Sequence, residues 1–381
     1  MAKGNTLTGL IPSLYAAMDV VSRELVGFIP AVGRDAKADQ AAKGQTVRSP
    51  VTPEAKAQDI EPDVVAPSVE GQNIGYKDVT ITKSRMVPLV WNGEEQLALN
   101  AAGQTYNVIL ADQFTQALRT LTNEIETDLA GLFYGASRAV GTAGKTPFGV
   151  AGDLSDFALA RQVLEDNGAP QSDLQMVLGS GAIANLRGKQ SVLFKMNEAG
   201  TDALLREGTL GRVEGFSIHN SAGVRRQKLG EATGYLVNGA KKEGDRIIAI
   251  DTGSGEIKAG HVVTFAGDEH QYVVVAATAS SITLGGTGLM QDVADDIAMT
   301  VVGTFTPNMA FDRRALLLAT RVPAMPKGGD AAEDVMEITD PLSGLTFSVA
   351  LYKQYKQVSY EIGIAWGVAS VKEEHAALLL G

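Results

Sequence analysis

The sequence has 381 residues, a formal net charge of −11 and no cysteine, with 45% hydrophobic and 20% charged residues. At ~150 residues per domain, this length predicts two or three domains with ample core. The composition excludes disulfide scaffolds and cysteine-based chemistry, and its acidic balance argues against a dedicated nucleic-acid-binding protein.

The first 34 residues predict an amphipathic arm. Leu14, Met18, Val21 and Leu25 share one face of a 3.6-residue period. A polar linker is expected over residues 34–44. The arm is therefore predicted to dock on another molecule, although packing on its own domain is the alternative.

The sequence predicts neither a membrane span nor a secretory signal. No segment reaches the ~18 consecutive apolar residues that a transmembrane helix needs. Pro12, Asp19 and Arg23 interrupt the apolar stretch near the beginning of the sequence. We therefore expect a chain that stays inside the cell that makes it.

Residues 45–95 predict a long projecting hairpin. Strand-like segments at Gln45–Val51 and Val79–Val90 flank an acidic, proline-containing tip with Pro50, Pro53, Pro62 and Pro67. A loop this long is unusual in a compact monomer and is usually functional. We therefore expect this hairpin to be a binding loop.

The strongest local signal is a long helix over residues 107–135. One face is apolar for about six turns, and charged residues such as Glu124, Glu126 and Asp128 lie mostly off it. The apolar positions are Leu110, Phe114, Leu118, Leu121, Ile125, Leu129 and Leu132.

Downstream, three regions differ in their pattern of helix and strand signals. Residues 150–221 alternate helix and strand signals, with a strand at Leu174–Leu178 and a helix that starts near Ala182. Residues 222–303 carry strand-like runs at spacings of about ten residues, which predicts an inserted antiparallel barrel or sandwich. In residues 304–381 we expect a helical or mixed segment and then three strands, at Met309–Thr320, Val335–Thr339, Leu345–Lys353 and Val358–Ala369.

Two glycine-rich motifs are candidate phosphate or cofactor sites. Ala139–Thr146 approximates a phosphate-binding loop, but a helix rather than a strand is expected before it and no helical pattern follows Thr146. Gly179–Ala184 resembles a dinucleotide-binding turn, with Glu198 and Asp202 about twenty residues on, but no second parallel strand is expected to end at either acid. For both motifs, the surrounding sequence favours a glycine-rich structural turn over a phosphate or cofactor site.

No other catalytic, cofactor-binding or metal site is predicted. The histidines, His219, His261, His270 and His375, never reach the i, i+4 spacing of a helical ligand pair. Adjacent acidic pairs diverge from one another, and no Gly-x-Ser-x-Gly elbow is present. Arg225, Arg226 and Lys228 form a basic cluster that is either an interface or simply solvated. We therefore expect a protein that is not an enzyme.

Several segments resemble podovirus major capsid (coat) proteins. They occur in the same order over nearly the whole chain and are most specific in the first 96 residues. They are Asn5–Pro12, Val20–Pro30, Gly44–Arg48, Pro50–Pro53, Thr80–Arg85, Trp91–Gln96 and Asn308–Ala315.

The resemblance implies an α+β chain with the tailed-phage, Hong Kong ninety-seven type capsid fold. That fold has an N-terminal arm, an extended E-loop, a P-domain with a long spine helix, and an A-domain. Members of this branch add a small antiparallel β-barrel. The implied bounds are arm 1–34, E-loop 45–95, P-domain 96–149 and 304–381 with spine helix 107–135, A-domain 150–221 and insertion domain 222–303, with part of 304–381 returning to the A-domain.

The function implied is self-assembly, as hexamers and pentamers, into an icosahedral shell around phage DNA. The implied partners are a scaffolding protein, a portal protein and packaged double-stranded DNA without sequence-specific contact, with no membrane and no cofactor. The protein would lie in the virion, and in the host cytoplasm during assembly. An encapsulin-like nanocompartment shell and a phosphate-loop enzyme remain the alternatives.

The residues expected to serve this function lie on the two extensions. Asp19 and Glu24 are the candidate contacts of the scaffolding protein. The expected subunit-interface residues of the arm and E-loop are Leu14, Met18, Val21, Leu25, Val47, Arg48, Arg85 and Trp91.

Overall fold

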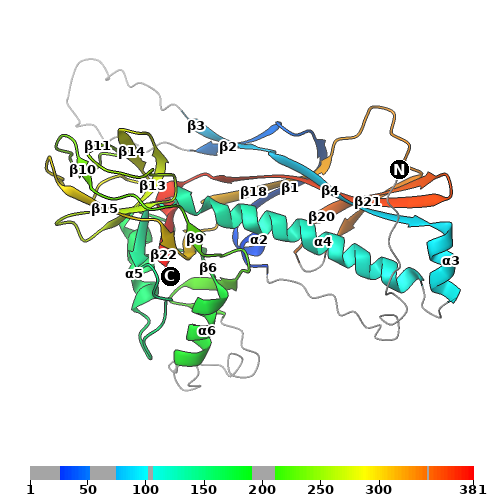
Figure 1. Cartoon of the computed structure of the whole chain (residues 1–381), viewed down its shortest axis with the longest axis horizontal. Helices are drawn as coiled ribbons and strands as arrows, with labels where there is room; N and C mark the ends of the chain where they lie inside the picture. Colours follow the sequence, from blue (N-terminus) through cyan, green and yellow to red (C-terminus); the bar gives the residue numbers. More distant parts are fainter. Residues whose placement is uncertain (1–25, 52–73, 102–105, 191–210, 341–342) are drawn as a thin grey trace, which may run out of the picture.

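The computed structural model describes residues 26–51, 74–101, 106–190, 211–340 and 343–381. Figure 1 shows an elongated molecule with the long helix α4 (Tyr106–Ala130) running obliquely through its middle. A group of short strands lies at one end, and helix α3 (Gly93–Ala101) lies at the other. Helices and sheets are mixed, as the sequence predicts. Every helix within these residues is too short or too polar to cross a membrane.

A six-stranded sheet forms one side of the molecule. Its central strand, β21, pairs with β4 along one edge and with β20 and β18 along the other. The outer strands β19 and β1 then pair with β20 and β18. The strands are β1 (Gly33–Ala41), β4 (Lys83–Asn92), β18 (Leu316–Pro323), β19 (Asp334–Thr339), β20 (Thr346–Gln354) and β21 (Gln357–Ser370).

Strand β1 corrects the polar linker expected over residues 34–44. The segment pairs in parallel with β18, with Gly33 opposite Leu317 and Ala41 opposite Pro323. Its alanine- and aspartate-containing sequence has little intrinsic strand preference. Pairing with a buried neighbouring strand overrides that preference, which local sequence does not reveal.

Helix α4 covers one face of this sheet. Ala117, Leu121, Ile125 and Leu129 are buried at helical spacing against the core, which includes Trp366 of β21. The helix continues into a short 3₁₀ helix, η1 (Gly131–Gly135). A helix is thus present over the region 107–135, where the apolar stripe predicts it.

The second sheet begins with a group of strands that packs one face against helices α5 (Ser155–Asp166) and α6 (Ser180–Lys189). Phe157 stacks between Phe148 and Phe216 in the core of this part. The strands, in spatial order, are β5 (Arg138–Gly141), β22 (Ala376–Leu380), β17 (Pro307–Asp312), β6 (Leu174–Leu178), β8 (Phe216–Asn220) and β7 (Arg212–Val213).

Two features of this part differ from expectation. The segment Met309–Thr320, expected to be helical or mixed, is divided between strands β17 and β18. Every residue of β17 is buried, so its sequence has no two-residue alternation that would mark a strand. Strand β22 was not expected at all; its five buried residues lie between β17 and β5.

Six further strands pair in a closed antiparallel ring. The ring runs β12–β15–β10–β11–β14–β13 and closes through β12 and β13. It is joined to the second sheet through β13 and β5. The strands are β10 (Tyr235–Val237), β11 (Ile247–Asp251), β12 (Val262–Phe265), β13 (Gln271–Ala277), β14 (Ser281–Leu284) and β15 (Ala298–Val302).

The chain enters and leaves this ring at one place. Strand β9 (Gln227–Lys228) precedes the ring, β16 (Thr304–Phe305) follows it, and the two pair with each other. The six strands therefore form a module inserted between neighbouring points of the fold.

A two-stranded ribbon, β2 (Thr46–Val51) and β3 (Gly75–Thr80), lies along the upper edge of Figure 1. The sequence predicted a longer second strand, Val79–Val90. Instead, the chain leaves the ribbon after Thr80, and Lys83–Asn92 joins the main sheet as β4. The remaining short elements are α2 (Phe28–Ala31) and the 3₁₀ helix η3 (Glu373–His375).

Candidate functional site

The phosphate-loop candidate does not have the geometry of a nucleotide site. The long helix expected upstream is present as α4 and η1, and a short strand that was not expected, β5, includes the first three residues of the motif. The next helix, α5, begins only at Ser155, so no helix N-terminus follows Lys145 and Thr146. The backbone N–H of Phe148 donates to the Asp156 carboxylate at 2.6 Å, within a groove of about 550 Å³. A carboxylate in this position disfavours a phosphate group.

The second glycine-rich motif is part of the packing. It connects β6 to α6, and β6 pairs in parallel with β8, which begins at Phe216 and therefore does not end at Glu198 or Asp202. The Gly179 N–H donates to Asn308 Oδ1 at 2.8 Å, and a Cβ on Gly179 would lie 3.2 Å from Val224. The close approach that glycine allows is thus used by the protein's own side chains. Glu198 and Asp202 lie outside the described residues.

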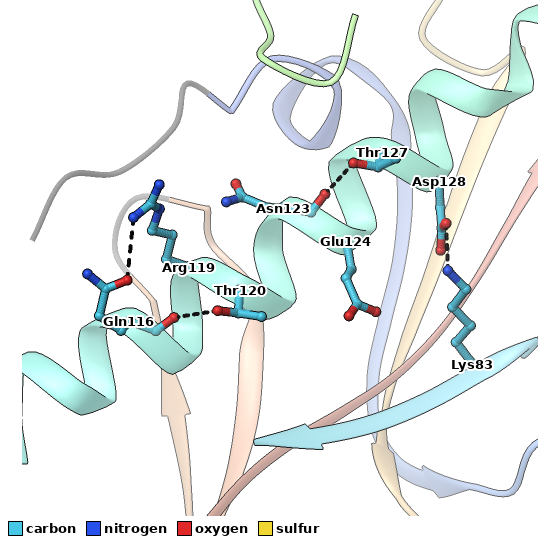
Figure 2. Close-up of a pocket in the computed structure, with 8 residues that line it drawn as sticks. All are labelled: Lys83, Gln116, Arg119, Thr120, Asn123, Glu124, Thr127 and Asp128. Atoms are coloured by element: carbon cyan, nitrogen blue, oxygen red, sulfur yellow. Dashed lines mark hydrogen bonds and ion pairs between the residues drawn. The ribbon is translucent and has the colours of Figure 1, made fainter. Parts of the chain in front are cut away.

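A groove of about 380 Å³ lies on the polar side of α4, and Figure 2 shows the side chains that line it. The hydroxyl groups of Thr120 and Thr127 donate to carbonyl groups of the preceding turn, at 2.9 Å and 2.8 Å. Asp128 accepts from Lys83 at 2.7 Å, also drawn in Figure 2, and from the Trp366 indole at 2.8 Å. These bonds assign Thr120, Thr127 and Asp128 to the structure of the helix and its contact with β4.

No described residues form a group of three metal ligands. The histidines are also dispersed: His219 bonds to Gln175 at 2.9 Å, and His261 is buried against backbone groups. Burial lowers the pKa of His219, and the charge of Arg313 adds to this shift. These contacts assign the histidines to the fold.

Glu126 joins three parts of the chain inside the protein. Its side chain is 2% exposed. It accepts the N–H groups of Phe28 and Ile29 at 3.1 Å and 2.8 Å, and the Ser221 hydroxyl at 2.6 Å. The carboxylate thereby fixes Phe28 and Ile29 of α2 against α4 and the segment after β8.

The neighbouring carboxylates hold the base of the ribbon. Asp128 binds Lys83, and Glu124 lies 3.6 Å from Arg85, both on β4 directly after the ribbon. The three acids are spaced two residues apart, so Glu124 and Asp128 share one side of α4 while Glu126 faces another. Phe28 and Ile29 and the base of the ribbon are thus attached to the same turns of α4.

The ribbon has a preorganised exposed surface. The Arg48 guanidinium lies 3.6 Å from the ring centroid of Tyr76 and donates to Asp78 at 3.0 Å and 3.3 Å. Arg48 pairs directly across from Asp78. Exposed Tyr76 and Ile74 add apolar area. A two-stranded ribbon exposed in this way is marginal alone and is typical of a surface that gains contacts from a partner.

The predicted interface residues divide into distinct environments. Arg48 is exposed on the ribbon, and Arg85 is largely exposed beside Glu124. Val47 packs partly against the protein's own core. The predicted arm and scaffold contacts lie outside the described residues, namely Leu14, Met18, Asp19, Val21, Glu24 and Leu25.

Trp91 is corrected from an interface residue to a core residue. It is 2% exposed, donates to Gln113 at 2.7 Å and packs edge-on against Tyr106 with centroids 5.3 Å apart. The sequence motif around Trp91 did not distinguish these roles, because both use a large aromatic side chain.

No protein-family model and no curated protein matches this chain. Among solved structures, it is similar to one from Mycobacterium phage Che8, with 12% identity over 94% of this chain and 92% of that chain and a TM-score of 0.49. The capsid structure of cyanophage P-SCSP1u matches with 11% identity over 96% and 91%, also at a TM-score of 0.49. A virus-like particle from Pyrococcus furiosus matches with 9% identity over 98% and 96%, at a TM-score of 0.40.

Proposed function

We propose that this protein is the major capsid protein of a tailed phage, whose copies assemble into a closed icosahedral shell. The observation that carries the proposal is the β2–β3 ribbon with its exposed Arg48–Tyr76–Asp78 cluster. A ribbon that leaves aromatic and aliphatic side chains in solvent is stabilised once another copy covers it.

In this proposal the chain has the layout that its sequence resembles. Residues 1–34 are the arm, 45–95 the E-loop, and 96–149 with 304–381 the P-domain. Residues 150–221 are the A-domain and 222–303 the inserted β-domain. The observation that β9 pairs with β16 supports the insertion, because it brings both ends of that segment together.

The proposed partners follow from the same layout. Copies associate as hexamers and pentamers, with a scaffolding protein at Asp19 and Glu24, a portal protein and enclosed double-stranded DNA. The net charge of −11 makes a wall that does not hold DNA strongly. The protein occupies the virion after assembly in the host cytoplasm.

Electron microscopy of the expressed protein tests the proposal. We expect closed shells or tubular polyheads. Monomers alone, with and without the scaffolding protein of the same phage, would overturn it. Shells that enclose a specific protein cargo rather than DNA would instead indicate a nanocompartment. Nucleotide binding that is lost in Lys145→Ala would indicate the alternative function, a phosphate-loop enzyme.

The scaffold contact has its own test. Reversing the charge of both Asp19 and Glu24 is expected to reduce scaffold-dependent shell yield, while shells that form without scaffold are unaffected. Unchanged yield in the doubly reversed protein would remove these residues from the proposal.

A further inference from the structure

One end of the molecule carries an exposed aromatic side chain on a tight turn. Tyr355, in the turn between β20 and β21, is 90% exposed. The next residue, Lys356, has φ +51, a left-handed conformation that non-glycine residues rarely adopt. Its ammonium group lies 5.6 Å from the Tyr355 ring centroid. Gln354 pairs with Gln357, so the turn has only two residues, and a left-handed residue is usual in so tight a hairpin.

Helix α3 forms a rigid wall beside this turn. Asn92 and Glu95 each accept the other's backbone N–H, at 2.8 Å and 3.0 Å, in a reciprocal cap at the start of the helix. The Gly93 N–H donates to the Lys356 carbonyl at 3.2 Å. These bonds fix the turn against the helix, and Figure 1 places both elements at the end opposite the β10–β15 ring.

A groove of about 780 Å³ lies between the turn and α3. Trp91, Glu94 and Leu97 line one side of it, and the turn residues line the other. Leu97 is 71% exposed, so an apolar side chain at the groove has no cover from the described part of the protein. An aromatic projection and an apolar recess thus lie next to each other on one surface.

The same surface carries one free charge of each sign. Glu94 and Lys356 both line the groove and are both exposed. Among the ion pairs formed between described residues, neither side chain takes part in one, and the two do not pair with each other. Opposite charges that remain unpaired on one patch are complementary to a second copy of that patch.

We propose that this end is a contact between copies of the chain, an inference that rests on the proposed shell function. Tyr355 of one copy enters the groove of the next beside Leu97, and Lys356 faces Glu94 of that neighbour. Tyrosine in a recess is a frequent centre of binding energy in interfaces. A projection meeting a different part of its neighbour is a heterologous contact, which closes when copies surround a rotation axis.

The contact is small, so it acts together with others. Stable protein interfaces bury about 1,200–2,000 Å² in total, whereas one aromatic side chain contributes about 150–250 Å². Each copy makes the contact twice, once with its Tyr355 and once with its groove, so a shell contains many such contacts and their loss is multiplied in the assembly yield.

Three variants of the purified protein test this contact. Tyr355→Ala, Glu94→Lys and Lys356→Glu are each expected to lower assembly about tenfold or more, measured by light scattering and by the shell fraction in a sucrose gradient. Thermal unfolding and circular dichroism confirm that each variant folds. Ile247→Ala, an exposed apolar residue of β11 at the other end, is the matched control and is expected to assemble like the unmodified protein.

A mixing experiment separates this contact from a general loss of stability. An equimolar mixture of Glu94→Lys and Lys356→Glu restores opposite charges at every contact between unlike copies, and the protein carrying both changes restores them between like copies. Both are expected to recover assembly to within about threefold of the unmodified protein. The inference is overturned if neither the mixture nor the doubly substituted protein recovers assembly. It is also overturned if Tyr355→Ala assembles normally.

The inference and the proposed function fail in different ways. If the unmodified protein forms shells and the variants do so equally well, only the contact is wrong. If the unmodified protein forms no shells, the proposed function fails. Sedimentation velocity at high protein concentration then still reads the contact: self-association lost in Tyr355→Ala supports it, and a strictly monomeric unmodified protein overturns it.

Discussion

The Glu126 carboxylate accepts the Ile29 backbone N–H at 2.8 Å, across 97 positions of the sequence. It also accepts hydrogen bonds from Phe28 and Ser221, so one acidic side chain near the C-terminal end of α4 satisfies three buried donors. Because water is excluded there, the bonds depend on this side chain alone. Glu126 therefore holds three segments of the chain together in the interior, although glutamate is usually found at the surface.

Removing this carboxylate is expected to destabilise the protein strongly. Glu126→Ala leaves three donors without an acceptor, each at about 1–3 kcal/mol, so the free energy of unfolding should fall by at least about 3 kcal/mol. Ser221→Ala removes one of these donors and also the acceptor of the Gly223 N–H, so it should lower the free energy of unfolding by about 1–3 kcal/mol. Urea unfolding measures both, and a loss below about 1 kcal/mol in Glu126→Ala would contradict the role of this carboxylate.

Two neighbouring acids on α4 should differ in effect. Asp128 accepts from Lys83 and from the buried Trp366 indole, so Asp128→Ala is expected to lower the free energy of unfolding by about 1–3 kcal/mol. Glu124 meets the largely exposed Arg85 at 3.6 Å, so Glu124→Ala should cost at most about 0.5 kcal/mol. Equal effects in chemical denaturation would show that the indole contact adds nothing.

The base of the ribbon depends on a glycine. A Cβ on Gly367 would lie 2.0 Å from the Thr80 carbonyl oxygen, so Gly367→Ala must displace the backbone where the ribbon meets β21. We expect a loss of at least about 2 kcal/mol and faster amide exchange at the base of β3.

Gly188 provides the control for this substitution. It lies within α6, and apart from its own helix backbone no described atom comes within 4 Å of the position that an alanine methyl group would take. Gly188→Ala should therefore stabilise the protein by about 0.5–1 kcal/mol. If both substitutions changed stability alike, backbone freedom rather than close approach would govern Gly367.

Stability should decrease in mild acid. Burial lowers the pKa of His219 and of His375, with charges of Arg313 and Lys372 respectively adding to the shifts. Below the unfolded value of 6.5, the unfolded chain takes up protons that the folded chain does not, so folding is progressively disfavoured as pH falls.

The measurement is the unfolding midpoint between about pH 7.5 and pH 5.5, a range that spans the usual histidine pKa. The decrease should be smaller in His219→Gln, whose amide can still donate to Gln175, and smaller again when His375→Gln is added. An unchanged slope in the double variant would assign the acid sensitivity to other groups.

The sequence predicted best where one local pattern extends over many residues. The apolar stripe of α4 continues for about six turns, and the strands at 271–277 and 281–284 are bounded by turn residues. It failed where pairing across the chain decides the structure: β1 is a strand because β18 is beside it, and β17 lacks alternation because both of its faces are buried.

The sequence likewise predicted only part of the candidate functional surfaces. The exposed position of Arg48 agrees with the predicted projecting hairpin, whereas Trp91 is in the core because Gln113 and Tyr106 reach it from α4. The role of Glu126 could not be read from sequence, since its partners are 95 to 98 positions away. The groove beside Tyr355 joins segments around residues 94 and 356, which no sequence pattern relates.

The pairing of β5 with β22 also sets the order of folding. The Ser137 hydroxyl donates to the Ala376 carbonyl at 2.9 Å, across 239 positions. Contacts that close such long loops form late, whereas the β10–β15 ring closes over short distances and can form early. Until β22 arrives, the facing edges of β5 and β17 are unpaired and prone to aggregate, so productive subunits compete with this side reaction during every round of synthesis.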